Sequence, residues 1–359
     1  MCIACGTPLD QSRLDEFGER FAGMLNDSML MLMVSIGHRS GLFDAMADGT
    51  RMTSHELAER TGLNERYVRE WLGAMVAGRI VERNPDEGTH RLPAEHAHSL
   101  CRTSPTANLA IFAQYLPVLA SVEDQVLACF HDGGGVPYSA YRRFHDVMAE
   151  DSGQSIVPVI VDQVVPLVPG LHDRLSAGID VLDIGCGRGL AMIELARAYP
   201  ASRFVGYDLS AEAIETAQAT ARKARLSNIR FEVRDLTSWH EPGAFDWITA
   251  LDAVHDQARP DLVLRAVRRA LRPGGAFLMQ DIDLSSEPCD NIDHPLGAML
   301  YSISTMHCMT VSLAQGGLGL GTAWGIQLAE KMLRDAGFES IRVHRLEHDI
   351  QNAYFVMQT

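Results

Sequence analysis

The stretch VLDIGCGRGLAMIELA, residues 181–196, decides the fold. It begins as an apolar run, passes through Gly185, Gly187 and Gly189, and continues as an amphipathic helical pattern. Glycines at these positions permit a sharp turn and let a ligand lie against bare backbone. A dinucleotide-binding loop has the spacing G-x-G-x-x-G. Here Leu190 stands at the sixth position, so the spacing is G-x-G-x-G and a nicotinamide cofactor is disfavoured.

The chain on either side of this turn alternates between apolar runs and helical segments. Such alternation is typical of a parallel sheet covered on both faces. The last two runs, ESIRVHRL (339–346) and AYFVMQT (353–359), are separated by only a few residues, which permits an antiparallel pair but no parallel crossover. We therefore predict an α/β fold with a Rossmann-like sheet of seven strands, the last of them antiparallel. The five earlier strands are expected in DVLDI (180–184), RFVGYD (203–208), IRFEVRD (229–235), FDWITALD (245–252) and AFLMQDID (276–283).

Carboxylates stand at the ends of the two strands that follow the glycine loop. Asp208 lies 21 residues after Gly187, where an acid can accept hydrogen bonds from ribose hydroxyls. Asp235 ends the next strand, where a carboxylate can bind the amine of an adenine. Because open parallel sheets bind ligands at the carboxyl ends of their strands, these groups predict a nucleoside site.

These features together resemble the class I S-adenosylmethionine-dependent methyltransferases. The resemblance covers about residues 180–359 and is carried by DIGCGRG (183–189), Asp208, Asp235, LRPGG (271–275) and the terminal hairpin. It implies S-adenosyl-L-methionine as cofactor and S-adenosyl-L-homocysteine as product. In this family the loop lies under the methionine part, Asp208 binds ribose, and Asp235 with Leu236 flanks adenine. The cofactor residues that it implies are Asp183, Gly185, Cys186, Gly187, Gly189, Asp208, Leu209, Asp235, Leu236, Leu251 and Asp252.

The N-terminal part has the signals of a winged helix. A helix through Arg60 is capped by Thr53 or Ser54, and after a turn at Gly62 a second helix begins at Asn64. Two short strands, RIVER (79–83) and THRLP (89–93), follow and complete the helix, turn, helix and hairpin order. Upstream, residues 21–49 read as a long and a short helix broken at Gly37 and Gly41. The expected organisation is a flexible arm (1–20), a winged-helix-like dimerisation domain (21–103), a helical connector (104–169) and a catalytic domain (170–359).

This N-terminal part is similar to the domain with which many small-molecule O-methyltransferases dimerise. The resemblance implies a homodimer and a small-molecule acceptor. More closely, the chain resembles an actinobacterial group of two-domain methyltransferases often labelled transcriptional regulators, and MHCMTVSLAQGGLGLGTAWG (306–325) supports this.

His255 is the expected catalytic base. S-adenosylmethionine supplies an activated methyl group, so the protein must position the acceptor and remove its proton. Histidine suits this task because its pKa lies near that of the medium. VHD (254–256) matches the H-D of the O-methyltransferase motif, although Gln257 stands where tryptophan is common. Asp256 is expected to orient the imidazole or to cap the helix after Pro260, and the alternative for His255 is plain loop packing.

A second candidate, His307, lies in an apolar insertion after the fifth strand. It is either a base or a buried core histidine, and Tyr301 and Trp324 nearby are either an apolar acceptor wall or core. YRRFHDVMAEDS (141–152) resembles the segment before the catalytic domain of O-methyltransferases. It implies that Phe144 and Met148 contact cofactor or substrate, with interdomain packing as the alternative. Asp281 and Asp283 either contact the acceptor or are solvated.

Composition excludes several other classes of protein. The formal net charge is −15, from 31 basic and 46 acidic residues, which disfavours a duplex-binding protein. No apolar run approaches the roughly 20 residues of a membrane helix. Seven scattered cysteines make no disulfide framework, which favours the cytoplasm. Cys2 and Cys5 form a C-x-x-C without a second pair, so no metal site is expected.

Two alternative functions remain open from the sequence. One is a DNA-binding regulator gated by the cofactor, with NERYVREWLGAMVAG (64–78) as recognition helix and Arg66 and Arg69 as its contacts. DNA is an unfavoured partner, because residues 1–100 hold 10 basic against 15 acidic residues. Tyr67, Trp71 and Met75 also follow helical spacing, which predicts a packed face. The other alternative is an N- or C-methyltransferase that needs no protein base.

Overall fold

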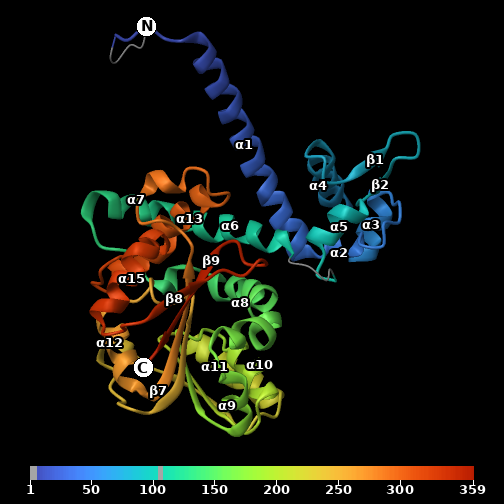
Figure 1. Ribbon diagram of the computed structural model, residues 1–359. Helices are drawn as coiled ribbons and strands as arrows, with labels where there is room; N and C mark the ends of the chain where they lie inside the picture. The colour runs from blue at the N-terminus through green and yellow to red at the C-terminus, as the bar shows by residue number, and fades with distance from the viewer. Residues whose placement is uncertain (1–5, 104–107) are drawn as a thin grey trace. The chain divides into compact units, whose positions relative to one another are not determined.

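The computed structural model describes residues 6–103 and 108–359 (Figure 1). The chain divides into two compact units, residues 1–117 and 118–359. Among the described residues, no single helix is long and apolar enough to cross a membrane. One bent pair, Phe144–Leu167 with Leu171–Ala177, meets that criterion only when the two are taken together.

The first unit begins with a 30-residue helix, α1 (Gln11–Ser40). The carboxylate of Asp10 caps it by accepting hydrogen bonds from the backbone N–H groups of Ser12 and Arg13. The helix therefore starts inside residues 1–20, where we expected a flexible arm. The predicted break at Gly37 is wrong, because α1 ends only at Gly41, whose φ is 75°. A Cβ at position 37 would lie 2.6 Å from the ring of Trp71, so close packing explains this glycine.

The rest of this unit has the predicted winged-helix order. Thr53 caps α3 in a capping box with Glu56, and Asn64 caps α4. One face of α4 is buried through Val68, Trp71, Leu72 and Met75, whereas Tyr67 is 80% exposed. Our expectation that Tyr67 packs is therefore wrong, because the buried face runs through its neighbour Val68. The elements are α2 (Leu42–Ala45), α3 (Ser54–Thr61), α4 (Glu65–Ala77), β1 (Glu82–Asn84), β2 (Thr89–Arg91), α5 (Ala94–Leu100) and η1 (Leu109–Gln114).

Short helices lead from the winged helix to the sheet. The helical stretch that we expected at 104–169 extends to Ala177, and the division between the units at residues 117 and 118 falls inside it. Its elements are α6 (Tyr115–Ala120), α7 (Glu123–Asp132), η2 (Tyr138–Ala140), α8 (Phe144–Ser155), η3 (Val157–Val159), η4 (Ile160–Val164), η5 (Val165–Leu167) and α9 (Leu171–Ala177).

The second unit is built on a seven-stranded sheet in the order β5-β4-β3-β6-β7-β9-β8. The first five strands in this order are parallel, and β9 runs antiparallel to both of its neighbours, as predicted. The strands are β3 (Asp180–Ile184), β4 (Arg203–Asp208), β5 (Ile229–Val233), β6 (Phe245–Leu251), β7 (Leu271–Ile282), β8 (Ile341–His344) and β9 (Asn352–Gln358). Because β3 pairs with both β4 and β6, the direction of winding reverses there, and open sheets bind ligands at such a point.

Helices cover both faces of this sheet (Figure 1). Val181 and Leu182 are neighbours in β3 but belong to two different buried clusters, as the alternation of side chains along a strand requires. One cluster includes Phe277 and the other includes Trp247, and both side chains are fully buried. The remaining elements are α10 (Leu190–Ala198), α11 (Ala211–Lys223), η6 (Leu236–Ser238), α12 (Pro260–Ala270), η7 (Pro288–Asn291), α13 (Gly297–Ile303), η8 (Ser304–Cys308), α14 (Met309–Ala314), η9 (Thr322–Trp324) and α15 (Gly325–Asp335).

Candidate active site

The glycine loop joins β3 to α10, and glycine is required at its three positions for different structural reasons. All three adopt positive φ, at 68° for Gly185, 51° for Gly187 and 69° for Gly189. A Cβ at Gly185 would lie 2.5 Å from the Cβ of Ala253, and one at Gly189 would lie 2.3 Å from the ring of Phe231. At Gly187 a Cβ would meet nothing within 4 Å. The loop therefore packs closely at its two ends and presents bare backbone to open space at its middle.

Asp208 lies at the end of β4, beside the middle of this loop. One carboxylate oxygen accepts a hydrogen bond from the N–H of Gly187 at 2.8 Å, and the other accepts one from the N–H of Ser210 at 2.8 Å. Each carboxylate oxygen can accept about two hydrogen bonds, so capacity remains for two hydroxyl groups. Leu209, next in the chain, is an exposed apolar side chain at this edge. The backbone N–H of Cys186 donates to the carbonyl of Tyr207, which holds the loop against β4.

Two carboxyl groups, the buried Asp183 and the half-buried Asp252, lie at the ends of β3 and β6. Asp183 is 2% exposed, and it accepts a hydrogen bond from Thr249 Oγ1 at 2.7 Å. Burial raises the pKa of Asp183 to about 7, and burial likewise raises the pKa of Asp252 to about 7. Asp252 follows Leu251 with a φ of 54°, which is strained for a residue other than glycine. Such strain at the end of a strand is common at functional sites.

Asp235 and Leu236, the expected adenine-binding pair, lie in different surroundings. Asp235 is exposed, and its carboxylate accepts hydrogen bonds from the backbone N–H and hydroxyl of Thr237 at 2.8 and 2.7 Å. The N–H of Arg234 bonds to the carbonyl of Asp208, so the ends of β4 and β5 lie side by side. Leu236 is buried in the core, so only its backbone, and not its side chain, is available to contact a ligand beside Asp235.

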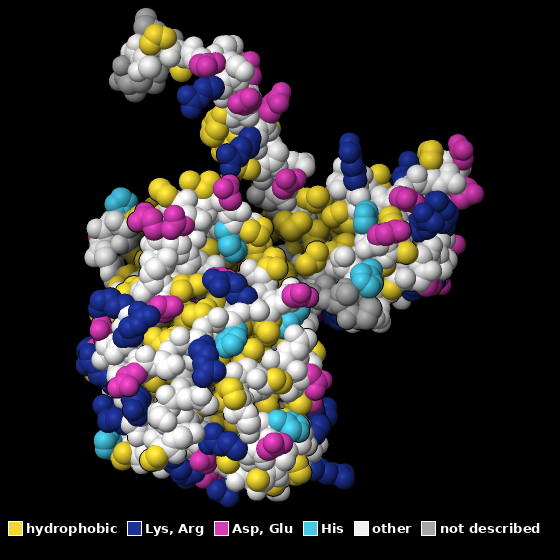
Figure 2. Space-filling view, in the orientation of Figure 1, with side chains coloured by type: hydrophobic (Ala, Val, Ile, Leu, Met, Phe, Trp, Pro, Cys, Tyr) yellow, Lys and Arg dark blue, Asp and Glu magenta, His cyan; other side chains and the backbone are white. Residues whose placement is uncertain are grey.

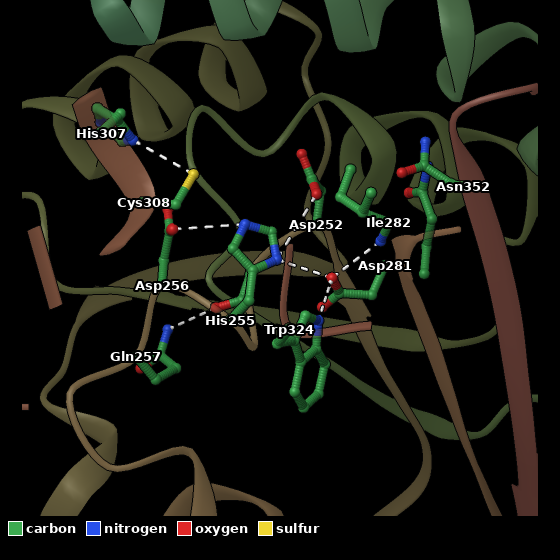
Figure 3. Close-up of polar contacts among 12 residues, drawn as sticks. Asp252, His255, Asp256, Gln257, Asp281, Ile282, His307, Cys308, Trp324 and Asn352 are labelled. Atoms are coloured by element: carbon green, nitrogen blue, oxygen red, sulfur yellow. Dashed lines mark hydrogen bonds and ion pairs between the residues drawn. The ribbon is translucent and has the colours of Figure 1, made fainter. Parts of the chain in front are cut away.

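His255 lies among carboxylates after the end of β6 (Figure 3). It is 2% exposed, with Nδ1 2.8 Å from Asp281 Oδ1 and Nε2 3.4 Å from Asp256 Oδ1. Burial lowers the pKa of His255, but the charges of Asp281 and Asp256 outweigh burial and hold the pKa well above its usual value. These two carboxylates therefore favour the charged form of the imidazole.

Asp281 is the residue that orients this imidazole. Its Oδ1 also accepts hydrogen bonds from Trp324 Nε1 and from the backbone N–H of Ile282, both at 2.9 Å. We expected Asp256 either in this role or as the cap of the helix after Pro260. Asp256 faces Nε2 and accepts a hydrogen bond from Tyr138 at 2.7 Å. The position of Asp281 near the end of its strand was a signal for this contact, because β7 pairs in parallel with β6 and the carboxyl ends of the two strands lie together. No comparable signal in the sequence pointed to Tyr138.

His307 lies in η8, one turn of π-helix between α13 and α14. It is fully buried, and its ring stacks on Phe144 with 3.6 Å between the centroids. The rings of Tyr138 and Tyr141 pack edge-on against it at 5.1 and 4.6 Å. Burial lowers the pKa of His307 to about 4, so it is neutral. Its Nδ1 lies 3.6 Å from Cys308 Sγ, and within the described ranges Nε2 has no hydrogen-bond partner.

The other expected acceptor residues are spread over several environments. Met148 is half-buried in α8, and the hydroxyl of Tyr301 accepts a hydrogen bond from Asn291 at 3.2 Å. Trp324 is 4% exposed and donates to Asp281, so it holds the site rather than offering a free apolar wall. Asp283 pairs with Arg345 at 2.8 Å.

The arginines that a DNA-reading helix would use are paired within α4. Arg66 forms an ion pair with Glu70, and Arg69 lies 3.4 Å from Glu65. Cys2 and Cys5 lie outside the described residues.

Two family models match the chain in the order that the fold shows. A model described as Rv2258c-like winged HTH domain matches residues 28–102, and one described as methyltransferase domain matches residues 175–337. The chain therefore carries a winged-helix domain followed by a methyltransferase domain.

Two curated proteins of similar sequence are methyltransferases. The chain is 33% identical over 112 residues to a ubiquinone biosynthesis O-methyltransferase of Albidiferax ferrireducens, covering 30% of this chain and 43% of that one. It is 33% identical over 131 residues to the 27-O-demethylrifamycin SV methyltransferase of Amycolatopsis mediterranei, covering 36% and 46%. The chain thus spans less than half the length of these curated relatives.

Solved structures share the fold over nearly the full chain. Human N-acetylserotonin methyltransferase, in complex with S-adenosylmethionine, superposes with a TM-score of 0.69 at 18% identity, covering 99% of both chains. An O-methyltransferase family protein from Burkholderia thailandensis superposes with a TM-score of 0.66 at 19% identity, covering 98% of both. At these identities the likeness concerns the fold.

Proposed function

We propose that this winged-helix methyltransferase transfers the methyl group of S-adenosyl-L-methionine to an oxygen of a small, largely apolar acceptor. The observation that carries the proposal is the open face of Gly187 beside the Asp208 carboxylate, at the point where the sheet reverses its winding. The cofactor supplies an activated methyl on a sulfonium centre. The chain would supply the bare backbone at Gly187 for the cofactor to lie against. The carboxylate oxygens of Asp208 would accept hydrogen bonds from its hydroxyl groups.

His255 is the proposed base for the acceptor hydroxyl. Its Nδ1 is bound to Asp281, so Nε2 is the nitrogen that can take a proton from an acceptor. The same two carboxylates that hold the ring favour its charged form. Base catalysis therefore needs the neutral imidazole and is favoured by alkaline pH, and Asp281 then stabilises the imidazolium that forms.

Aromatic side chains around His307 support an apolar acceptor. Phe144, Tyr141 and Tyr138 pack around the neutral His307, and Tyr138 also bonds to Asp256 beside the proposed base. His307 Nε2 offers one polar contact in this apolar setting. Sites for small ligands commonly combine an apolar lining with a few placed polar groups.

We also propose a homodimer formed through the N-terminal unit. The support is an exposed apolar stripe on α1, with Leu14, Phe17, Phe21 and Leu25 each between 46% and 62% exposed. Figure 2 shows apolar side chains along this helix among charged ones. Contiguous exposed apolar surface of this kind marks interaction sites.

The cofactor proposal is tested by titration calorimetry on folded, ligand-stripped protein. We expect binding of both S-adenosylmethionine and S-adenosylhomocysteine, and at least about a tenfold loss of affinity in Asp208→Ala, since hydrogen bonds to a charged group contribute about 1.5–3 kcal/mol. Glu215→Ala, on the exposed face of α11, is the matched control and should bind as the wild type does. Absence of heat with both compounds would overturn the proposal.

The acceptor atom is tested with cofactor carrying an isotope-labelled methyl group and a panel of phenols, alcohols and amines. We expect label on oxygen, and a loss of about 100-fold or more in turnover in His255→Ala, the size expected for a general base. Unchanged turnover in that variant, with label on nitrogen, would favour an amine acceptor that needs no base.

A further inference from the structure

We propose that His255 Nε2, Asp256 Oδ1 and Cys308 Sγ bind one divalent transition-metal ion of the zinc class, with a fourth coordination position left open. The three atoms lie within 4.8 Å of one another, and they come from the loop after β6 and from η8 (Figure 3). Imidazole, carboxylate and thiolate are the ligand types that zinc takes. Three protein ligands with one open position are typical of catalytic rather than structural zinc sites.

The distance between the nitrogen and the oxygen fits a tetrahedral ion. Zinc–nitrogen and zinc–oxygen bonds of about 2.0–2.1 Å place neighbouring ligand atoms about 3.3 Å apart in a tetrahedron. His255 Nε2 and Asp256 Oδ1 lie 3.4 Å apart. The structure shows no hydrogen bond to Asp256 Oδ1 from any described residue, although the atom is buried. An ion between these atoms would satisfy that orphaned oxygen.

The outer contacts of the ligands are those that a metal site needs. Metal-bound histidines commonly donate their second N–H to a carboxylate, and ligating carboxylates are themselves hydrogen-bonded. His255 Nδ1 has Asp281 at 2.8 Å, so Nε2 is the nitrogen that can bind the ion, with release of its proton. Tyr138 donates to Asp256 Oδ2 at 2.7 Å, which leaves Oδ1 for the ion. In each residue, therefore, the outer atom has a hydrogen-bond partner, and the inner atoms, Nε2 and Oδ1, face one another.

Cys308 provides the sulfur, and its surroundings exclude water. The side chain is 5% exposed, and His307 Nδ1 lies 3.6 Å from Sγ. In its Nδ1–H tautomer His307 donates to the sulfur, and hydrogen bonds to ligand sulfurs tune such sites. A π-helical turn carries both residues, and such turns frequently lie at functional sites.

The opposite side of His255 fits an ion less well. Asp252, His255 and Asp281 also lie close together, but Nδ1 and Asp281 Oδ1 are only 2.8 Å apart, a direct hydrogen-bond distance. That oxygen also accepts from Trp324 and Ile282, so it is fully used. The ion is therefore assigned to the Nε2 side.

The metal site itself does not depend on the proposed function. Only its effect on catalysis rests on the proposal that His255 is the base. An ion on Nε2 occupies the nitrogen that the proposed base uses, so the two roles exclude one another. The metal-loaded protein is then a resting form, and removal of the ion frees the base.

The test uses full-length protein with Cys2→Ser and Cys5→Ser, so that the C-x-x-C cannot bind the probe. Cobalt(II) is titrated in as a spectroscopic substitute for zinc. We expect one ion per chain, visible bands of a four-coordinate ion and a near-ultraviolet thiolate-to-cobalt charge-transfer band, all lost on addition of zinc. Cys308→Ser should lose the charge-transfer band, and Tyr138→Phe should bind cobalt about tenfold more weakly.

Cys289→Ser is the matched control, since Cys289 is an exposed thiol of the same unit and should not contribute. Circular dichroism shows whether each variant remains folded, and calorimetry with S-adenosylmethionine separates failure of this proposal from failure of the cofactor proposal. If Cys308→Ser does not fold, Asp256→Asn replaces it and should bind cobalt at least about tenfold more weakly. The proposal is overturned by a missing charge-transfer band, or by a band that survives Cys308→Ser.

Discussion

His255 is held by two carboxylates whose charges act on its proton in the same direction. Burial alone would lower its pKa, yet Asp281 and Asp256 raise it well above the usual value. In metal-free protein we therefore expect the His255 resonance in histidine NMR to titrate on the alkaline side of about 6.5, the ordinary value. Asp281→Asn keeps a hydrogen-bond acceptor but removes the charge, so the midpoint should move to lower pH.

The variant His255→Gln assigns the resonance, and Asp283→Asn is the control for the titration. Asp283 is close in sequence but pairs with Arg345, so its loss should leave the midpoint in place. A midpoint near 6.5 that is the same in wild type and Asp281→Asn would show that the carboxylate does not act on this ring. It would also remove the reason for alkaline base catalysis.

At the scale of the element, β3 carries two aspartates in opposite environments. Burial raises the pKa of Asp183 to about 7, whereas Asp180 binds Arg203 through two hydrogen bonds that lower its pKa. For Asp183 the folded chain holds the proton more tightly than the unfolded chain. The raised pKa of Asp183 therefore has no effect on the free energy of unfolding below about pH 4. It lowers that free energy increasingly as the pH rises from 4 to 7.

Asp183→Asn should accordingly stabilise the fold at pH 8 by on the order of 3–4 kcal/mol and change little at pH 4. Asparagine can still accept the hydrogen bond from Thr249. Asp180→Asn is the control on the same strand and should destabilise slightly at pH 8, because it loses an exposed ion pair. Urea unfolding at both pH values measures this, and a pH-independent effect of Asp183→Asn would contradict the assignment.

A second prediction at this scale concerns the glycines after α7. A Cβ at Gly135 would lie 1.9 Å from the carbonyl oxygen of Thr310 in α14, so this glycine permits close backbone packing. Gly135→Ala should reduce the free energy of unfolding by 1–3 kcal/mol or more, about the cost of overpacking. Gly134 has a φ of 79° with nothing within 4 Å, so Gly134→Ala should lose only about 1 kcal/mol. Equal losses in urea unfolding would contradict this distinction.

The elements were more predictable from the sequence than the contacts between them. The glycine loop and the strands have local signals, because turn residues and apolar runs depend on neighbours in the chain. We missed the start of α1, although Asp10 is a residue that can cap a helix. We also placed Tyr67 on the wrong face of α4. The buried face of α4 is selected by its contact with α1, where Trp71 donates a hydrogen bond to the Met33 carbonyl. His255 had a motif, whereas its contact with Asp281 depends on the pairing of β6 with β7.

The cluster around His255 joins segments that lie far apart in the sequence. Tyr138 reaches Asp256 across 118 positions, and Trp324 reaches Asp281 across 43. A single sequence contains no signal for such pairs, since each depends on how whole elements pack. The same reason explains why no metal ligand was expected at Cys308.

At the scale of the whole molecule, the apolar stripe of α1 and the net charge have opposite effects on self-association. Each chain carries a formal charge of −15, so two chains repel one another, while burial of Phe17 and Phe21 favours association. We expect a dimer by light scattering after size exclusion, and stronger association at higher salt because salt screens the repulsion. Phe17→Asp with Phe21→Asp should give monomers with unchanged circular dichroism. Glu19→Lys, on the opposite side of the helix, should leave the dimer intact, and a wild type that stays monomeric at high salt would exclude this interface.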